Sequence, residues 1–562
     1  MLKGHPKGLF VLALANMGER FGYYTMLAIF VLFIQAKFGF DKNASSEIFS
    51  NFLALVYFLP LLGGIVADRF LGYGKTVIAG VVVMFVGYLL LAMPTGVDTA
   101  AKYMMYGALG LISIGTGLFK GNIQALVGNL YDDPKYNSKR DMAFSIFYMC
   151  INIGAFFAPS AAGAVYNFFL KRAGLFYEAK IPALAHQLTN GTITPEGLAS
   201  FKQLAEAQTP GASANLQAFG ANYIEKLSEG YNYGFGVACV SLVISILIFA
   251  LFRKYYKAAD VTARQQQKAD VASGQTNHVE ELSGAETKQR LIALCLVFAV
   301  VIFFWMAFHQ NGLTLTWFAR DYTNSAVGGL TRIGFGLPTM VMMIVAFYGI
   351  LGFIQAKSNN TKVISAIAFL IGAGGAYAYY VGMPEILTIT PEIFQQFNPF
   401  FIVILTPVSV AFFSMLNSKD KEPSAPRKIG IGMFIAAFAF IMMAIGSLGL
   451  PNPDAIASTG GVSDVLVSPN MLIGTYFMLT IAELFLSPMG LSFVSRVAPP
   501  KYKGLMQGGW LAATAIGNKC VAIIGYLWGI ELWIMWGVLV VLCIISGTFI
   551  FSIMKKLEAV SK

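Results

Sequence analysis

Long apolar stretches recur along the whole chain, and shorter polar segments separate them. About fourteen of them reach 18 or more residues, the length at which a helix can cross the hydrocarbon core of a bilayer. They lie at about 9–35, 47–67, 75–95, 103–130, 142–168, 232–253, 290–318, 335–356, 363–383, 397–417, 428–450, 469–495, 505–528 and 531–554. This pattern predicts an all-α integral membrane protein that crosses the bilayer many times.

Composition supports the same class of protein. The 562 residues are 57% hydrophobic and 12% charged, whereas soluble domains carry about 25% charged residues. A short polar leader before a long, polar-faced first span predicts that no signal peptide is cleaved. The five cysteines lie in apolar spans without motif spacing, so we expect no disulfide and no metal site. We expect no cofactor either.

The net charge of +11 could indicate a nucleic-acid partner, but its distribution favours membrane topology instead. Basic residues gather in alternate loops, for example at Lys135, Lys139 and Arg140, while the intervening loops carry few. Lys and Arg are enriched in cytoplasmic loops of membrane proteins. We therefore expect both termini in the cytoplasm, a location in the cytoplasmic (inner) membrane, and no nucleic-acid binding.

Polar stretches divide the chain into two hydrophobic halves. We expect an N-terminal six-helix bundle at 1–253 with an external insertion at about 170–231, a cytoplasmic linker at 254–288, and a C-terminal bundle at 289–562. The C-terminal part has two spans more than six, which we assign to an extra helical hairpin at about 333–384. Two related bundles are typical of transporters whose site lies at the midplane between them.

The first span carries charged residues near its middle. An ionised side chain at that depth costs at least about 2.5–3.5 kcal/mol unless it faces protein, a partner or water. Side chains three and four positions apart share one face of a helix. Here one such polar face holds Asn16, Glu19, Arg20, Tyr23 and Tyr24. That face predicts the wall of a substrate pathway.

Further polar and aromatic residues lie inside other predicted spans. They are Lys120, Asn152, Trp305, His309, Gln310, Asn398, Glu483 and Trp510. Lys120 is too deep to reach an interface and needs an anionic partner, either a protein side chain or the substrate. Glu19 is the nearest candidate. The cations Arg20 and Lys120 belong to one half and the anion Glu483 to the other, which suits a zwitterion with separated charges. We expect the aromatic residues to line pockets, with ordinary helix packing as the alternative.

The second span ends with Gly63-Gly64-Ile65-Val66-Ala67-Asp68-Arg69-Phe70-Leu71-Gly72. Small residues let helices approach each other closely. Asp68 and Arg69 could pair across a bundle and separate when the halves move, and a simple interfacial charge pair in a turn is the alternative. The segment resembles the loop between the second and third helices of the major facilitator superfamily, so we expect Asp68 and Arg69 to take part in gating.

Several motifs follow one another in order over both halves. They are Glu-Arg-Phe-Gly-Tyr-Tyr at 19–24, Thr-Gly-Leu-Phe-Lys at 116–120, Phe-Tyr-Met-Cys-Ile-Asn-Ile-Gly at 147–154, Phe-Asn-Pro at 397–399, Pro-Arg-Lys-Ile-Gly-Ile-Gly at 426–432 and Glu-Leu-Phe-Leu-Ser-Pro-Met-Gly-Leu-Ser at 483–492. Together they resemble the proton-dependent oligopeptide transporter family of the major facilitator superfamily. The resemblance implies a fold of two six-helix bundles.

The resemblance also implies roles for individual residues. Arg20 and Lys120 match the basic residues that meet the peptide carboxylate in this family. The residues that match those at the peptide's amino end are Asn152, Asn398 and Glu483. The tyrosines that match pocket-lining residues of the family are Tyr23, Tyr24 and Tyr57.

Three positions depart from the family pattern. Asn16 stands where the first Glu of Glu-x-x-Glu-Arg is usual, Leu27 where an Arg is usual, and His309 where an acidic residue is usual. Loss of the Arg and the acid together agrees with charge balance, since either alone would be costly in the membrane. The residues that we expect to share proton coupling are Glu19, Lys120, His309 and Glu483. A neutral packing role is the alternative for His309.

We predict a monomeric transporter in the lipid bilayer that imports di- and tripeptides by alternating access, in symport with protons. One alternative is a relative that carries another small anion or zwitterion, or that works as a uniporter. An alternative of another class is a receptor or sensor that binds peptide without moving it. The sequence does not support an enzyme, because it shows no nucleophile–base arrangement and no cluster of metal ligands.

Overall fold

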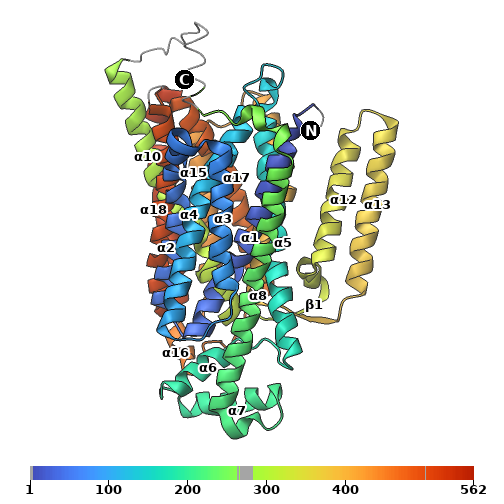
Figure 1. Cartoon of the computed structure of the whole chain (residues 1–562), viewed down its shortest axis with the longest axis vertical. Helices are drawn as coiled ribbons and strands as arrows, with labels where there is room; N and C mark the ends of the chain where they lie inside the picture. The colour runs from blue at the N-terminus through green and yellow to red at the C-terminus, as the bar shows by residue number, and fades with distance from the viewer. Residues whose placement is uncertain (1–3, 263–264, 266–282, 500–501, 562) are drawn as a thin grey trace.

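The computed structural model consists almost wholly of helices, most of which run along one long axis (Figure 1). It describes residues 4–262, 265, 283–499 and 502–561. In this part of the chain, 13 helices are long and apolar enough to cross a membrane. One further helix, α4 (Thr99–Asn129), has 31 residues and runs beside them. With α4 included, each of the predicted spans corresponds to a helix.

The first half contains six long helices. They are α1 (Lys7–Phe38), α2 (Lys42–Val66), α3 (Tyr73–Ala92), α4, α5 (Arg140–Arg172) and α8 (Leu216–Leu251). The Asp41 and Asp98 side chains accept hydrogen bonds from the first-turn N–H groups of α2 and α4, which would otherwise lack partners. Gly39 ends α1 with a φ of 64°, a conformation that glycine adopts without steric cost.

The second half also consists mainly of long helices, with a few short ones between and after them. Its helices are α10 (Gly284–Phe308), α11 (Thr314–Asp321), α14 (Phe397–Asn417), α15 (Ala425–Gly446), α16 (Pro453–Ala457), α17 (Pro469–Val497), α18 (Lys503–Tyr526), α19 (Leu532–Ser552) and α20 (Met554–Ser561). The short 3₁₀ turns η6 (His309–Gly312) and η8 (Pro391–Gln396) follow α10 and precede α14. Most of the linker expected at 254–288 lies outside the described residues.

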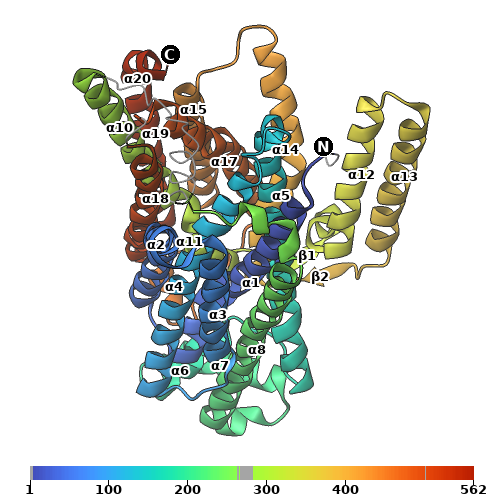
Figure 2. The ribbon, with the colours of Figure 1, turned by 45° about the horizontal axis from the view of Figure 1, so that its top comes forward.

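A pair of helices stands beside the main bundle (Figures 1 and 2). They are α12 (Leu337–Gln355) and α13 (Asn359–Val381). The antiparallel strands β1 (Ala326–Gly328) and β2 (Ile386–Thr388) join the two ends of this hairpin. The Tyr348 hydroxyl donates a hydrogen bond to the Val403 carbonyl of α14 at 2.9 Å. The hairpin lies within the stretch 333–384 that the sequence indicated.

Two short helices between α5 and α8 form a cap on one end of the bundle (Figure 1). They are α6 (Lys180–Thr189) and α7 (Pro195–Gln208). Both chain termini lie at the opposite end, so we name the two ends the cap side and the terminus side. A His186 ring nitrogen lies 2.9 Å from the Ala36 carbonyl oxygen of the first half, and the Gln187 amide donates to the Ala457 carbonyl of the second half. The cap therefore crosses the seam between the halves.

Ion pairs and hydrogen bonds close the seam on the cap side. Lys42, at the start of α2, lies 3.0 Å from the Asp321 carboxylate at the end of α11. Arg320 also binds Asp321, and its guanidinium donates to the Gln35 side chain of α1 at 2.8 Å. Asp321 is only 1% exposed, so two cations hold one buried carboxylate where the halves meet.

Candidate substrate-binding site

A buried ion pair occupies the middle of α1. The Arg20 guanidinium donates to both Glu19 carboxylate oxygens, at 2.5 and 2.6 Å. Glu19 is fully buried and Arg20 almost so. The guanidinium also lies over the Tyr23 ring, 4.8 Å from its centre. Neutralisation between neighbours explains how one helix can carry two charges at this depth.

Lys120 of α4 has a different partner from the expected one. Its ammonium lies 3.6 Å from the centre of the Tyr57 ring of α2, a cation–π contact. Its charge interacts with those of Arg20 and Glu19, but no carboxylate of the described residues lies within ion-pair distance of it. The expected ion pair between Glu19 and Lys120 is therefore not formed in this structure, because the Arg20 guanidinium donates to both carboxylate oxygens of Glu19.

Glu483 of α17 is the anion of the second half. Its carboxylate accepts hydrogen bonds from the Asn398 amide at 2.9 Å and from the Tyr148 hydroxyl at 3.1 Å. Tyr148 belongs to α5 of the first half, so this contact crosses the seam. The Asn152 amide donates to the Tyr148 carbonyl one turn away. Among the described residues no cation pairs with Glu483, which is only 7% exposed.

Two tyrosines lie near both the cationic and the anionic groups. The Tyr24 hydroxyl interacts electrostatically with Arg20 and with Glu483, and the Tyr57 hydroxyl does so with the same two residues. Tyr24 also meets the Tyr23 ring edge to face, at 5.2 Å between centres. The structure therefore brings groups from both halves to one level. The predicted residues that it brings together are Glu19, Arg20, Tyr23, Tyr24, Tyr57, Lys120, Asn152, Asn398 and Glu483.

His309 lies between aromatic rings of the two halves. Its ring stacks on Trp305 at 5.1 Å between centres and lies 5.8 Å from the Tyr57 ring. Tyr57 thus contacts both His309 and Lys120. His309 Nδ1 and Trp305 Nε1 are buried without a hydrogen-bond partner among the described residues. Such donors and acceptors in a polar site are available to water or cargo.

Two predicted contact residues lie elsewhere. The Gln310 amide is fully buried and bonded within its own half, to Thr314 Oγ1 and to the carbonyls of Met306 and Val521. Its hydrogen-bonding groups are occupied by protein, so the structure does not support the predicted substrate contact. The Trp510 ring lies so close to Gly490 that a Cβ there would be 1.8 Å away, which indicates packing between α17 and α18.

Asp68 and Arg69 form a π-helical turn at the end of α2, on the terminus side. Asp68 accepts a hydrogen bond from the Tyr73 hydroxyl at 2.8 Å. Among the described residues neither side chain forms an ion pair. Pairing across a bundle is therefore absent in this structure, and the gating role stays a prediction.

Some polar contacts of the site and its surroundings were not predicted from the sequence. Tyr148 stands in a quoted motif but had no assigned role, because nothing in its spacing indicates contact with a residue of the other half. Lys519, deep in α18 by its position in the chain, pairs with Glu47 of α2. The signal for this pair is the presence of opposite charges in two otherwise apolar spans.

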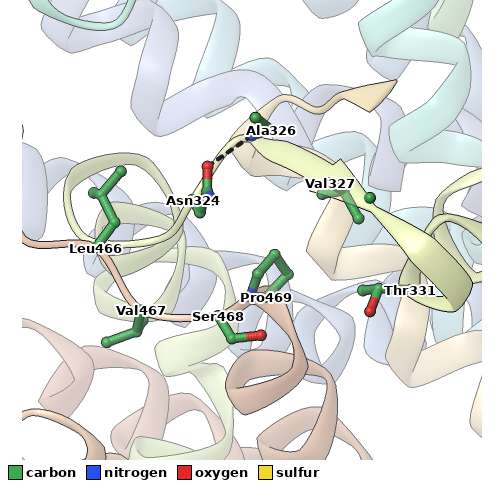
Figure 3. Close-up of a pocket in the computed structure, with 9 residues that line it drawn as sticks. Asn324, Ala326, Val327, Thr331, Leu466, Val467, Ser468 and Pro469 are labelled. Atoms are coloured by element: carbon green, nitrogen blue, oxygen red, sulfur yellow. Dashed lines mark hydrogen bonds between the residues drawn. The ribbon is translucent and has the colours of Figure 1, made fainter. Parts of the chain in front are cut away.

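Two cavities lie on the cap side, and the predicted site residues line neither. One, of about 330 Å³, lies between β1 and the start of α17, where Asn324 bonds the Ala326 amide (Figure 3). The other, of about 370 Å³, lies beneath the cap. Residues of α1, α6 and the 453–461 segment line it, so both halves contribute to its walls.

Comparisons with known proteins agree with this architecture. The chain is 25% identical to dipeptide and tripeptide permease A of Escherichia coli, over 91% of this chain and 82% of the permease. It is 26% identical to the peptide transporter YePEPT of Yersinia enterocolitica, over 93% and 88% of the two chains.

Solved structures show the same fold. A crystal structure of a mutant of the peptide transporter POT superposes with a TM-score of 0.65 at 23% identity, over 100% of this chain and 97% of that chain. A POT family transporter in complex with 5-aminolevulinic acid superposes with a TM-score of 0.65 at 19% identity, over 100% of this chain and 98% of that chain. The fold is therefore the two-bundle major facilitator fold. Residues 74–271 and 380–527 match the POT family (PTR2), and because this match extends over both halves, the chain belongs to the POT family.

Proposed function

We propose that this protein imports di- and tripeptides by alternating access and couples their entry to protons. The observation that carries the proposal is a pair of unmatched charges in one polar site. Lys120 of the first half has no carboxylate partner, and Glu483 of the second half has no cation partner, among the described residues. Both lie beside tyrosines of the same cluster.

A peptide with free ends has the charges that this site lacks. Its carboxylate would pair with Lys120, while Arg20 is already neutralised by Glu19. Its ammonium group would pair with Glu483 and compete for the oxygens that Asn398 and Tyr148 now occupy. Complementary charges at both ends select for zwitterions of limited length. The names of the relatives, which include dipeptide and tripeptide permeases, support the same cargo.

Because Glu483 bonds residues of both halves, it also links cargo binding to the position of the halves. An ammonium group that displaces the Tyr148 hydroxyl would loosen one contact across the seam. A ligand shifts a conformational equilibrium only through such differential contacts. We propose that Glu19, Lys120, His309 and Glu483 carry the coupling protons, since each is an acidic or basic side chain of this site that can gain or lose a proton.

We further propose that the cap side faces outward and the terminus side faces the cytoplasm, in the inner membrane. Lys135 and Lys139 follow α4 on the terminus side, and Lys419 and Lys421 follow α14 on the same side. Such loops are cytoplasmic under the positive-inside rule. We expect the monomer to be the transporting unit, because one chain supplies both halves of the site.

The test is uptake of a dipeptide panel into proteoliposomes, with and without an inward acid gradient. Accumulation above the external concentration only under the gradient supports symport. Equilibration of the peptide that does not depend on the gradient indicates a uniporter. The departures from the family pattern at Asn16, Leu27 and His309 are the reason for considering this alternative. Binding without uptake would contradict transport and indicate a receptor.

Lys120→Met and Glu483→Gln test the two charges separately. Loss of a buried charge contact costs about 2–5 kcal/mol, so each variant should lower dipeptide uptake at least about tenfold. Glu196→Gln on α7 is the matched control for loss of an acidic charge and should transport normally. Normal uptake by the Glu483 variant would overturn the proposed ammonium contact.

A further inference from the structure

A second carboxyl group, outside the site described above, lies buried in the seam between the halves. Glu392, in the turn η8 of the second half, has no exposed surface. Its Oε1 accepts hydrogen bonds from the Tyr166 hydroxyl of α5 at 2.9 Å and from the Thr390 hydroxyl. Its Oε2 is buried without a partner among the described residues. Gly163 of α5 allows this approach, since a Cβ there would lie 2.7 Å from Oε1.

The elements around Glu392 offer it hydroxyl groups and no cation. The titratable groups nearby in the first half are Tyr166 of α5, Tyr177 of the segment that follows it, and Tyr231 of α8. α14 contains no titratable side chain. Among the described residues, no Lys, Arg or His forms an ion pair with Glu392.

The two remaining neighbours of η8 do not supply a countercharge either. α1 contacts η8 through the Ala28 carbonyl, which accepts from Gln395 at 3.2 Å. α11 carries Arg320, but Asp321 and Gln35 engage its guanidinium. A buried carboxylate without a cation is strongly unfavourable, whereas a protonated carboxyl group is tolerated.

The contacts around Glu392 cross the seam between the halves. Ser160 of α5 donates to the Gln396 side chain at 2.7 Å, next to the Tyr166–Glu392 contact. Together with the Gln395 contact, these bonds hold η8 against both α5 and α1 of the first half. Separation of the halves on the cap side would take α5 away from η8 and admit water to the carboxyl group.

We propose that Glu392 is a proton-binding residue of the transport cycle, which must be protonated before the outer side can close. On closing it takes one proton from the external solution, and on reopening it returns that proton to the same solution. The closed form therefore binds this proton more tightly than the open form, so external acid favours closure. The inference rests on the proposed function in one respect, namely that the cap side faces outward.

The test follows the two halves without any peptide, so a failure of peptide transport cannot imitate its failure. Spin labels at Val97→Cys and Leu448→Cys, in a cysteine-free full-length chain in lipid nanodiscs, report the distance between the halves on the cap side. One linked proton changes the closed-to-open ratio by at most about tenfold per pH unit. We expect the closed fraction to rise as the pH falls.

Glu392→Gln keeps the shape and remains neutral, so the closed fraction should be high and should lose the pH dependence that Glu392 gives to the parent. Glu385→Gln, an exposed glutamate before β2, is the control and should keep the pH dependence of the parent. The proposal would be overturned if Glu392→Gln kept the pH dependence of the parent. It would also be overturned if the closed fraction of the parent did not change with pH.

A second variant and a spectroscopic signal test the proposal even if Glu392→Gln does not fold correctly. Tyr166→Phe removes a donor that stabilises the carboxylate, so closure should persist and its midpoint should move to higher pH. Infrared difference spectra of the closed parent should show a protonated-carboxyl C=O band that is absent in Glu392→Gln. An unchanged midpoint together with an unchanged band would equally contradict the assignment.

Discussion

At the scale of residues, the chemistry depends on which buried charges are matched within the protein. Glu19 and Arg20 neutralise each other through two short hydrogen bonds. Lys120 rests on the Tyr57 ring instead. A cation–π contact contributes about 0.5–2 kcal/mol, less than a buried ion pair can. Lys120 therefore remains available to a carboxylate of the cargo.

His309→Gln tests the coupling role at this scale. The amide keeps a polar side chain beside Trp305 and Tyr57 but cannot take up a proton near neutral pH, as an imidazole can. We expect gradient-driven accumulation of dipeptide to be lost, while counterflow with dipeptide on both sides continues. Accumulation that stays unchanged at several external pH values would remove His309 from the mechanism. His186→Gln in the cap is the control.

At the scale of elements, glycines set how closely the helices of the first half pack. α2 and α4 cross where Gly63 meets Gly117, and a Cβ at position 63 would lie 2.0 Å from the Gly117 carbonyl oxygen. The adjacent Gly64 has no atom within 4 Å of the same position. The crossing holds α2 against α4, and these helices carry Tyr57 and Lys120.

Gly63→Ala should destabilise the protein by about 1–3 kcal/mol, because overpacking forces the two backbones apart. Gly64→Ala should be neutral or slightly stabilising, since alanine favours the helix and meets no neighbour. Thermal unfolding of both variants in one detergent gives the comparison. Equal melting temperatures would show that the crossing can relax without cost.

At the scale of the whole molecule, the contacts on the cap side determine how readily the halves separate there. Asp321 holds Lys42 of the first half and Arg320 of the second. The cap adds Gln187–Ala457 and an exposed pair between Lys180 and Asp464. Exposed ion pairs contribute less to the stability of the closed seam than buried ones, because water screens the exposed charges.

Asp321→Asn should shift the molecule toward opening on the cap side. It leaves two cations without their carboxylate, and loss of one partner of a buried pair costs about 3–5 kcal/mol. The same spin-label distance between positions 97 and 448 should lengthen. Asp464→Asn is the control, since its side chain is 93% exposed and such a pair contributes about 0–1 kcal/mol. Equal distance distributions in the two variants would contradict this account of closure.

The pattern of apolar and polar residues was enough to predict the spans, the hairpin within 333–384 and the polar face of α1. These features depend on the cost of placing each segment in lipid, which is a local property of the chain. For the same reason the sequence singled out Arg20, Lys120 and Glu483 as intramembrane charges. The family resemblance, carried by local motifs in both halves, was also accessible at this stage.

The pairing of the polar groups could be read only from the folded arrangement of the helices. Arg20 rather than Lys120 neutralises Glu19, Asn398 and Tyr148 reach Glu483 from two halves, and Gln310 bonds inside its own half. Glu392 is a buried carboxyl group here, with Tyr166 of α5 packed against η8. Hydrogen bonds and ion pairs act over a few ångströms, and the residues that they join here are often hundreds of positions apart, so spacing along the chain carries no information about them.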